Sequence, residues 1–231
     1  RHLPAAEKPP VIPGSSAPLE SREQPRRNEG IDFIIETARR YSSHQPLTLL
    51  TIGAATDAAS ALLLEPSLVE RIRVVSMAFH SVTGGGHEFN VRNDPKAWQV
   101  VLDAPVPLTI GPAETCLRDL LMTLDKARLL FEGCGEAGEY LVGLLQWWLN
   151  AQPKVAKDVT GRGDAWVIWD EIVTAHLLGW TETERLPRPY LLDNLDFEFA
   201  PREGHPHPTV KWIKSVNSER LWSDLAQLLN R

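Results

Sequence analysis

The first half of the chain alternates between stretches with helical spacing and stretches with strand-like spacing of apolar residues. Residues 30–41 place apolar side chains on one face of a predicted amphipathic helix. The apolar run 47–52 ends at Gly53, a pattern typical of a buried parallel strand. Further helices are predicted at 56–64, 68–72 and 95–102, and further strands at 73–79 and 107–110. Three alternations of strand and helix indicate βαβ units, which build a parallel sheet with helices on both faces.

The second half of the chain is mainly helical in its pattern. Broad apolar stripes predict helices at 116–131 and 136–149, and residues 150–164 form a predicted polar linker. The other elements predicted are a strand end at 165–171 leading into a helix at 171–178, two antiparallel strands near 181–185 and 208–215, and a helix at 218–229. The prediction is therefore an α/β protein with an open, mainly parallel sheet, a helical insertion and a small C-terminal antiparallel extension.

The N-terminal stretch has a different composition from the rest of the chain. Residues 1–28 hold six of the eighteen prolines and show little periodicity. This predicts an extended, Pro-rich lead-in with one short strand at 10–12. Residues 29–231 are predicted to form a single α/β domain.

Composition narrows the class of protein. The net charge of -6 argues against a surface that coats nucleic acid. No apolar run approaches the roughly 20 residues of a membrane-spanning helix. The two cysteines, Cys116 and Cys134, are eighteen positions apart with a helical pattern between them, too far for a disulfide. Two reduced thiols fit a reducing compartment, and we expect a cytoplasmic protein.

The segment from Gly86 to Pro95 carries the strongest candidate chemistry. Glu88 and Asn90 are two positions apart, so in an extended segment both side chains point to the same side. The carboxylate of Glu88 accepts hydrogen bonds, and the carboxamide of Asn90 both donates and accepts them. Together they would suit the vicinal hydroxyls of a sugar. The simpler alternative is a polar loop end that caps the following helix, for which Asp94-Pro95 is a typical start.

The order of five sequence blocks resembles the inosine/uridine-preferring nucleoside hydrolase family. The resemblance runs from about Val11 to the C-terminus. The blocks are Gly30 to Glu36, Leu50 to Ala59, Glu65 to Arg73, Glu88 to Pro95, and Trp169-Asp170 before a helix. The family has a Rossmann-like fold and cleaves the N-glycosidic bond of ribonucleosides, using a tightly bound calcium ion that activates water.

The resemblance implies roles for particular residues. Glu88 and Asn90 match the pair that holds the ribose. Asp170 matches the carboxylate that closes the calcium site from the C-terminal side. Ile52 stands where the family supplies a backbone carbonyl to the metal.

Two further substrate contacts are candidates, each with a simpler alternative. Trp169 stands where well-known family members have a histidine, so it is a candidate for the wall of the nucleobase pocket. Its simpler alternative is ordinary aromatic packing. His80 flanks the Gly-rich loop 84–86 and could face a substrate, or it could be a solvated or structural residue.

One feature of the family is missing from this sequence. Family members carry an N-terminal strand followed by an Asp-rich loop, roughly D-x-D-x-x-x-D-D, which supplies most calcium ligands and the general base. The first thirty residues here contain no aspartate. We therefore expect the catalytic base outside this chain, and weak or no calcium binding by the chain alone. Three explanations of the missing Asp-rich loop stay open. The chain could be a fragment of a longer protein, it could be one half of a site that a partner completes, or it could be a degenerate homologue that has lost the loop.

The function predicted for the complete protein is hydrolysis of ribonucleosides to ribose and free base through calcium-activated water. The alternative is a non-catalytic homologue that binds ribose or a nucleoside, and a weaker third possibility is a purely structural interaction protein. The expected partner is a small-molecule ribonucleoside, with neither nucleic acid nor membrane. A homo-oligomer or a complementing N-terminal segment is also possible.

Overall fold

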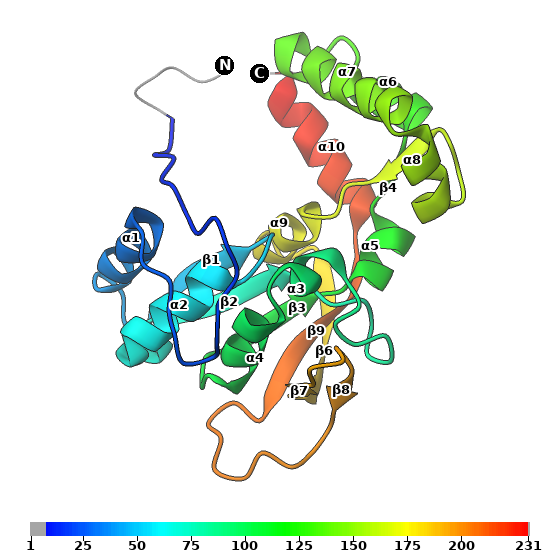
Figure 1. Ribbon diagram of the computed structural model, residues 1–231. Helices are drawn as coiled ribbons and strands as arrows, with labels where there is room; N and C mark the ends of the chain where they lie inside the picture. The colour runs from blue at the N-terminus through cyan, green and yellow to red at the C-terminus, as the bar shows by residue number, and fades with distance from the viewer. Residues whose placement is uncertain (1–7, 231) are drawn as a thin grey trace. The chain divides into compact units, whose positions relative to one another are not determined.

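The computed structural model describes residues 8–230 of the chain, which divide into two compact units. The sheet unit contains residues 11–114 and 183–214. The helical unit contains residues 115–182 and 215–230 together with the described residues 8–10. Figure 1 shows the elements of both units along the chain.

A five-stranded sheet forms the centre of the sheet unit, in the order β1-β2-β3-β9-β6. Its strands are β1 (Leu47–Thr51), β2 (Ile72–Met77), β3 (Leu108–Gly111), β9 (Thr209–Val216) and β6 (Thr181–Pro187). The pairs β1/β2, β2/β3 and β3/β9 are all parallel. The predicted mainly parallel α/β sheet is thus confirmed.

The two strands predicted near 181–185 and 208–215 are present as β6 and β9, which are neighbours in the main sheet, and β9 also pairs with β3 through Thr109 and Lys211. One detail of the predicted sheet is wrong, because β1 is only partly buried. Leu50 is 40% exposed, and Ile52, the residue directly after the strand, is 49% exposed. Within the described residues β1 has a neighbouring strand on one side only, and the apolar sequence of 47–52 could not reveal that edge position.

The helices of the sheet unit pack beside its strands around one apolar core. They are α1 (Glu29–Ala38), α2 (Thr56–Leu64), the 3-10 helix η2 (Pro66–Glu70), α3 (Phe89–Asn93) and α4 (Pro95–Asp103), and a short hairpin of β7 (Tyr190–Leu191) and β8 (Phe197–Glu198) follows. Helix α2 packs against both α1 and α4. Trp98 of α4 is fully buried against Phe79, with ring centroids 5.0 Å apart.

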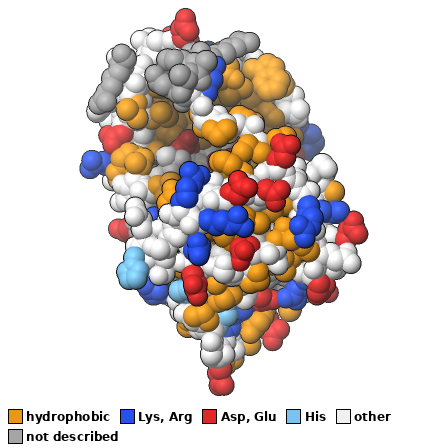
Figure 2. Space-filling view, turned by 90° about the vertical axis from the view of Figure 1, so that its left-hand side faces the viewer, with side chains coloured by type: hydrophobic (Ala, Val, Ile, Leu, Met, Phe, Trp, Pro, Cys, Tyr) orange, Lys and Arg blue, Asp and Glu red, His pale blue; other side chains and the backbone are white. Residues whose placement is uncertain are grey.

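The lead-in is extended, and from residue 11 onward it is attached to the sheet unit. Residues 8–28 contain no helix or strand, so the strand predicted at 10–12 is wrong, and residues 1–7 of the lead-in lie outside the described part. Leu19 is buried and donates its backbone N–H to Asp94 at 2.9 Å. The backbone N–H of Ser15 bonds Asp57 at 3.0 Å. Figure 2 shows one face of the molecule, on which acidic and basic side chains are interspersed and form no patch of one sign.

The helical unit departs most from the predicted pattern. The helix predicted at 116–131 is interrupted by a short strand, and the linker predicted at 150–164 contains a helix. The elements are α5 (Ala113–Asp119), β4 (Leu121–Thr123), α6 (Leu124–Phe131), α7 (Gly135–Ala151), α8 (Pro153–Thr160), β5 (Ala165–Val167), α9 (Glu171–Leu177) and α10 (Ser218–Leu229). Both cysteines are buried, and neither forms a disulfide within the described residues. None of the described helices is long and apolar enough to cross a membrane.

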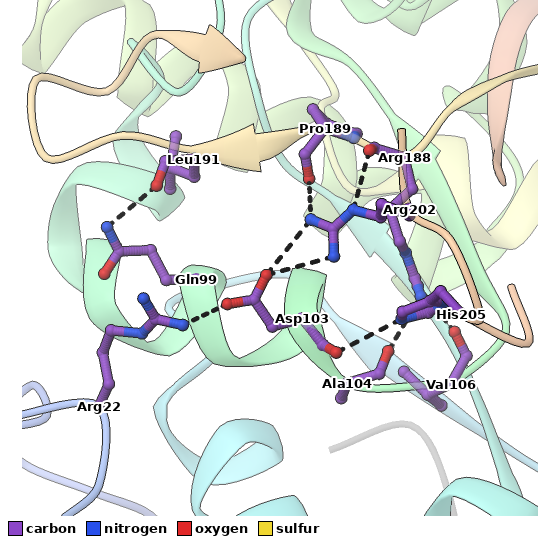
Figure 3. A network of polar contacts seen from close by, with 10 residues as sticks. All are labelled: Arg22, Gln99, Asp103, Ala104, Val106, Arg188, Pro189, Leu191, Arg202 and His205. Atoms are coloured by element: carbon purple, nitrogen blue, oxygen red, sulfur yellow. Dashed lines mark hydrogen bonds and ion pairs between the residues drawn. The ribbon is translucent and has the colours of Figure 1, made fainter. Parts of the chain in front are cut away.

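Two arginines, Arg188 and Arg202, bind the segment before β9 to the C-terminal end of α4 (Figure 3). Arg188 is fully buried and donates to the carbonyl oxygens of Ala104 at 2.9 Å and Val106 at 2.7 Å. Burial lowers the pKa of Arg188 to about 10, so the guanidinium stays charged at neutral pH. Arg202 donates to the carbonyl of Pro189 at 2.6 Å and to the carboxylate of Asp103 at 3.3 Å.

His205 belongs to the same network and fits it only as a neutral ring. Its Nδ1 accepts the backbone N–H of His207 at 3.0 Å, while its Nε2 lies 3.4 Å from the carbonyl oxygen of Asp103 and can donate to it. Because protonation would place a hydrogen on Nδ1, it would break the first of these bonds. Burial, and then the nearby charge of Arg188, lower the pKa of His205.

We therefore expect acid to weaken this attachment. Because the pKa of His205 is lower in the folded chain, the unfolded chain binds more protons than the folded chain just below pH 6.5. The free energy of unfolding therefore falls as the pH drops through that range. Because His205 is partly exposed, solvent screens these interactions and the loss of stability between pH 7 and about pH 5 should be small. Urea unfolding of His205→Asn should show a smaller pH dependence than the wild type. The exposed His44 offers a control, and equal slopes for His205→Asn and His44→Asn would contradict the assignment.

Candidate functional site

Glu88 lies at the start of α3 and is almost completely buried, with 8% of its surface exposed. Its two carboxylate oxygens accept the backbone N–H groups of Asn90 at 2.9 Å and Val91 at 3.2 Å. Asn90 is already inside the helix, so the extended arrangement predicted for these two residues is wrong. The alternative, a polar loop end that caps the next helix, describes the local geometry.

The Gly-rich loop sets the position of this helix start. Gly85 has φ +54°, and a Cβ atom there would lie 2.5 Å from the carbonyl oxygen of Leu195. The neighbouring Gly86 donates its N–H to that same carbonyl at 2.7 Å. A side chain at position 85 would therefore be strained both by its backbone conformation and by the close approach of residue 195.

Asn90 connects α3 to the carboxyl end of β2. Its side-chain nitrogen donates to the carbonyl oxygen of Met77, the last residue of β2, at 3.0 Å. Thr51 of β1 is in register with Ser76 of β2, so Ile52 follows β1 at the level of Met77. Ile52, Asn90 and the start of α3 consequently meet at the carboxyl edge of the parallel sheet, where open α/β folds bind ligands.

The charge on Glu88 is only partly compensated. Burial raises the pKa of this carboxyl, while backbone N–H groups, led by those of Asn90 and Val91, lower it. A buried carboxylate stabilised by backbone donors can still accept a ligand hydroxyl or stabilise positive charge that develops beside it. This is the chemistry that the sugar-binding prediction requires.

The segment after β2 shows backbone strain beside His80. Phe79 adopts φ +68° although it is fully buried, a conformation that is rare for a bulky residue and recurs at functional sites. Its carbonyl accepts the N–H of Ala113 at 2.9 Å. His80 itself is exposed, and its Nδ1 lies 3.4 Å from the hydroxyl of Ser81. The sequence did not single out Phe79, because nothing in an apolar strand end indicates a positive φ.

Asp170 and Trp169 lie in the helical unit, directly before α9. Asp170 is the N-cap residue of α9, but its exposed side chain makes no capping hydrogen bond to the helix. Partial burial and the adjacent charge of Glu171 raise the pKa of Asp170. Trp169 packs edge-on against Trp166 with ring centroids 6.2 Å apart. That contact matches the aromatic-packing alternative for Trp169.

The described residues do not assemble a metal cage by themselves. Within residues 8–230, no group of three or more His, Cys, Asp or Glu side chains could hold a metal ion. A calcium ion takes about six to eight oxygen ligands. Asp170 and the carbonyl of Ile52 supply two at most, so this set of residues does not fit the ion on its own.

Asp94 is a buried polar residue whose importance the sequence showed only in part. It caps α4 by accepting the N–H of Ala97 at 3.0 Å, as Asp94-Pro95 predicted. It also accepts the hydroxyl of Thr56 at 2.6 Å and the N–H of Leu19 at 2.9 Å. One carboxylate thus joins the lead-in, α2 and α4, and this holds the polypeptide around the start of α3 in place.

The fold and these residues define an α/β protein with a polar site at the carboxyl edge of a parallel sheet. The model of the inosine-uridine preferring nucleoside hydrolase family matches residues 4–223. The chain belongs to this family, and the resemblance seen in its sequence blocks is confirmed.

Two curated relatives match part of this chain and part of their own length. An uncharacterized protein of Schizosaccharomyces pombe is 34% identical over 110 residues, which are 44% of this chain and 34% of the relative. The pyrimidine-specific ribonucleoside hydrolase RihB of Escherichia coli is 27% identical over 138 residues, which are 56% of this chain and 42% of that protein. The matches thus span well under half the length of these relatives.

Solved structures share the fold. A purine-preferring ribonucleoside hydrolase from Gardnerella vaginalis superposes with a TM-score of 0.71 at 21% identity, covering 90% of this chain and 69% of that one. A plant nucleoside hydrolase gives a TM-score of 0.69 at 17% identity, with the same coverage. At this level of identity the likeness concerns the fold alone.

Proposed function

We propose that the complete protein hydrolyses the N-glycosidic bond of ribonucleosides and releases ribose and the free base. The observation that carries the proposal is the pair Glu88 and Asn90, held at the carboxyl edge of the sheet in a member of the nucleoside hydrolase family. Cleavage of an N-ribosyl bond builds oxocarbenium-like positive charge on the sugar. The buried Glu88 carboxylate is suited to stabilise that charge, as carboxylates do in O-glycoside cleavage.

We assign substrate contacts to Glu88, Asn90, His80 and Trp169 in this proposal. A metal, calcium by the family resemblance, would be held in the complete protein with Asp170 and the carbonyl of Ile52 among its ligands. Because residues 8–230 do not form a metal cage, the remaining ligands and the general base would come from outside this part of the chain. The two buried thiols, which form no disulfide within the described residues, support a reducing compartment such as the cytoplasm, where the enzyme would serve purine or pyrimidine salvage.

A second candidate function is binding of ribose or a nucleoside without catalysis. The observation that favours it is that Glu88 uses both carboxylate oxygens on α3 and that Asn90 uses its amide nitrogen on Met77. In that case these residues would shape a pocket without acting on the reacting bond.

Hydrolysis measurements separate the two functions. The complete protein should cleave inosine or uridine, should lose this activity after chelation, and should regain it when calcium is added. Nucleoside binding without release of base, measured on the same protein by calorimetry, would instead support the non-catalytic function. If the complete protein neither binds nor cleaves a ribonucleoside, both functions are wrong.

Glu88→Gln tests the assigned role of the carboxylate. Glutamine keeps a carbonyl oxygen that can cap α3 but removes the charge, so kcat/KM should fall by about 100-fold to 1,000-fold. Because the folded state raises the pKa of Glu88, the folded protein binds more protons above pH 4.5, and the ionised side chain costs stability at neutral pH. Glu88→Gln should therefore unfold at neutral pH no more easily than the wild type.

The matched control for Glu88→Gln is Glu29→Gln, which neutralises an exposed carboxylate in the first turn of α1. It should leave both activity and stability unchanged. A Glu88→Gln variant with full activity would remove Glu88 from the proposed site.

A further inference from the structure

A hollow of about 380 Å³ lies within the helical unit, where α6, α7 and α10 pack against one another (Figure 1). All of the residues that line it belong to this unit. Most of them are apolar, and four are tryptophans, namely Trp147, Trp148, Trp166 and Trp222. We call this cavity the aromatic hollow.

The size and the walls of the aromatic hollow suit a small molecule. Pockets that bind small ligands measure about 300–1,000 Å³ and are lined mainly by apolar and aromatic side chains. The rings of Trp148 and Trp166 meet in its wall with centroids 5.0 Å apart and planes tilted by 57°. Trp147 is 62% exposed, so a ligand can reach the hollow from solvent.

Glu171 is the single charged residue among those that line the aromatic hollow. It lies in the first turn of α9, and its carboxylate forms no hydrogen bond or ion pair with any other of residues 8–230. Partial burial, and then the charge of Glu171, raise the pKa of Asp170, and no described basic side chain opposes that effect. The aromatic hollow therefore contains a negative charge without a counter-charge.

This combination of groups selects the charge of the ligand. The face of an aromatic ring attracts a cation, and tryptophan does so most strongly. A carboxylate adds Coulomb attraction, which is stronger in a cavity than in water. An anion would be repelled by Glu171, and a neutral ligand would leave its charge unpaired. A cation whose charge is spread over apolar groups also loses little hydration when it enters an apolar cavity.

We propose that the aromatic hollow binds a free, small organic cation of the quaternary ammonium type. Its apolar groups pack against the tryptophans, and its charge lies beside Glu171. The site is independent of the proposed function, because none of the residues assigned there to the nucleoside or the metal lines the hollow.

A pair of probes tests the charge preference. Calorimetric titration of the chain with phenyltrimethylammonium should give a dissociation constant of about 100 μM. In tert-butylbenzene a carbon atom replaces the charged nitrogen and the shape is kept, so this probe should bind at least about tenfold more weakly. Equal affinity for the two probes, or no binding of phenyltrimethylammonium up to about 1 mM, would overturn the proposal.

Substitutions locate the site. Glu171→Gln should raise the dissociation constant of phenyltrimethylammonium by about tenfold and leave that of tert-butylbenzene unchanged. The matched control is Glu219→Gln, which neutralises an exposed glutamate in the first turn of α10 and should change neither. Trp147→Leu should weaken binding of the cation about threefold or more, since it removes one aromatic face.

Circular dichroism checks that the three variants remain folded. Because Glu171 and Trp147 are not fully buried, their replacement should leave the helical content unchanged. A folded Glu171→Gln chain that binds phenyltrimethylammonium as tightly as the wild type would place the cation elsewhere and overturn the proposal.

Discussion

Asp170→Asn in the complete protein is expected to lower kcat/KM for its preferred nucleoside by about 1,000-fold, or about 4 kcal/mol of transition-state stabilisation. The carboxylate of Asp170 makes no capping bond to α9, so the fold itself makes little use of its charge. Asparagine keeps the shape of the side chain but is a much weaker ligand for a hard cation. Steady-state hydrolysis and calcium titration of the same preparation should show activity and metal affinity falling together.

Asp158→Asn is the control for this variant. Asp158 is exposed on α8 in the same unit, and its ion pair is with Lys154 one turn away. Its neutralisation should change neither activity nor calcium affinity. Full activity in Asp170→Asn would exclude Asp170 as a metal ligand, and unchanged calcium affinity together with lost activity would assign it another role.

Asp94→Ala is expected to destabilise the chain by about 3 kcal/mol. The carboxylate is 1% exposed, and it accepts hydrogen bonds from Leu19, Thr56 and Ala97. Its removal leaves three donors without their acceptor and takes away the cap of α4. Asp94→Asn keeps one carbonyl oxygen as an acceptor, so its loss of stability should be roughly half that of Asp94→Ala. Urea unfolding followed by tryptophan fluorescence measures the difference.

The comparison for Asp94 is Asp32→Ala, in the exposed first turn of α1. Surface replacements of this kind change stability by no more than about 0.5 kcal/mol. A loss below about 1 kcal/mol in Asp94→Ala would mean that backbone and water readily replace its three contacts. Asp94 would then not be what holds the lead-in to α2 and α4.

Elements whose signals are local were predicted well. The helix predicted at 218–229 is α10 (Ser218–Leu229), because its apolar period and its cap are both encoded within a few residues. Asn217 accepts the N–H of Arg220 at 3.1 Å, which is such a local cap. The start of α4 at Asp94-Pro95 was predictable for the same reason.

Elements that depend on distant partners were missed. The strand β4 interrupts an otherwise helical pattern because Leu121–Thr123 pairs with Ala165–Val167, more than forty positions away. The helix α8 lies in the stretch predicted as a polar linker, although Pro153 starts it and Gly161, with φ +72°, ends it. Its low apolar content is compatible with a helix that buries only Ala156.

The sequence by itself determined the family, the alternation of strands and helices, and the identity of the polar residues at the edge of the sheet. These features could be predicted because periodicity and short sequence blocks are properties of neighbouring residues. Only the tertiary structure decided how those residues are used. The carboxylate of Glu88 is bonded to α3 and the amide of Asn90 to Met77, while β1 lies at an edge of the sheet that the described residues form. Hydrogen-bond partners and strand neighbours depend on residues far apart in the chain, and no local pattern records them.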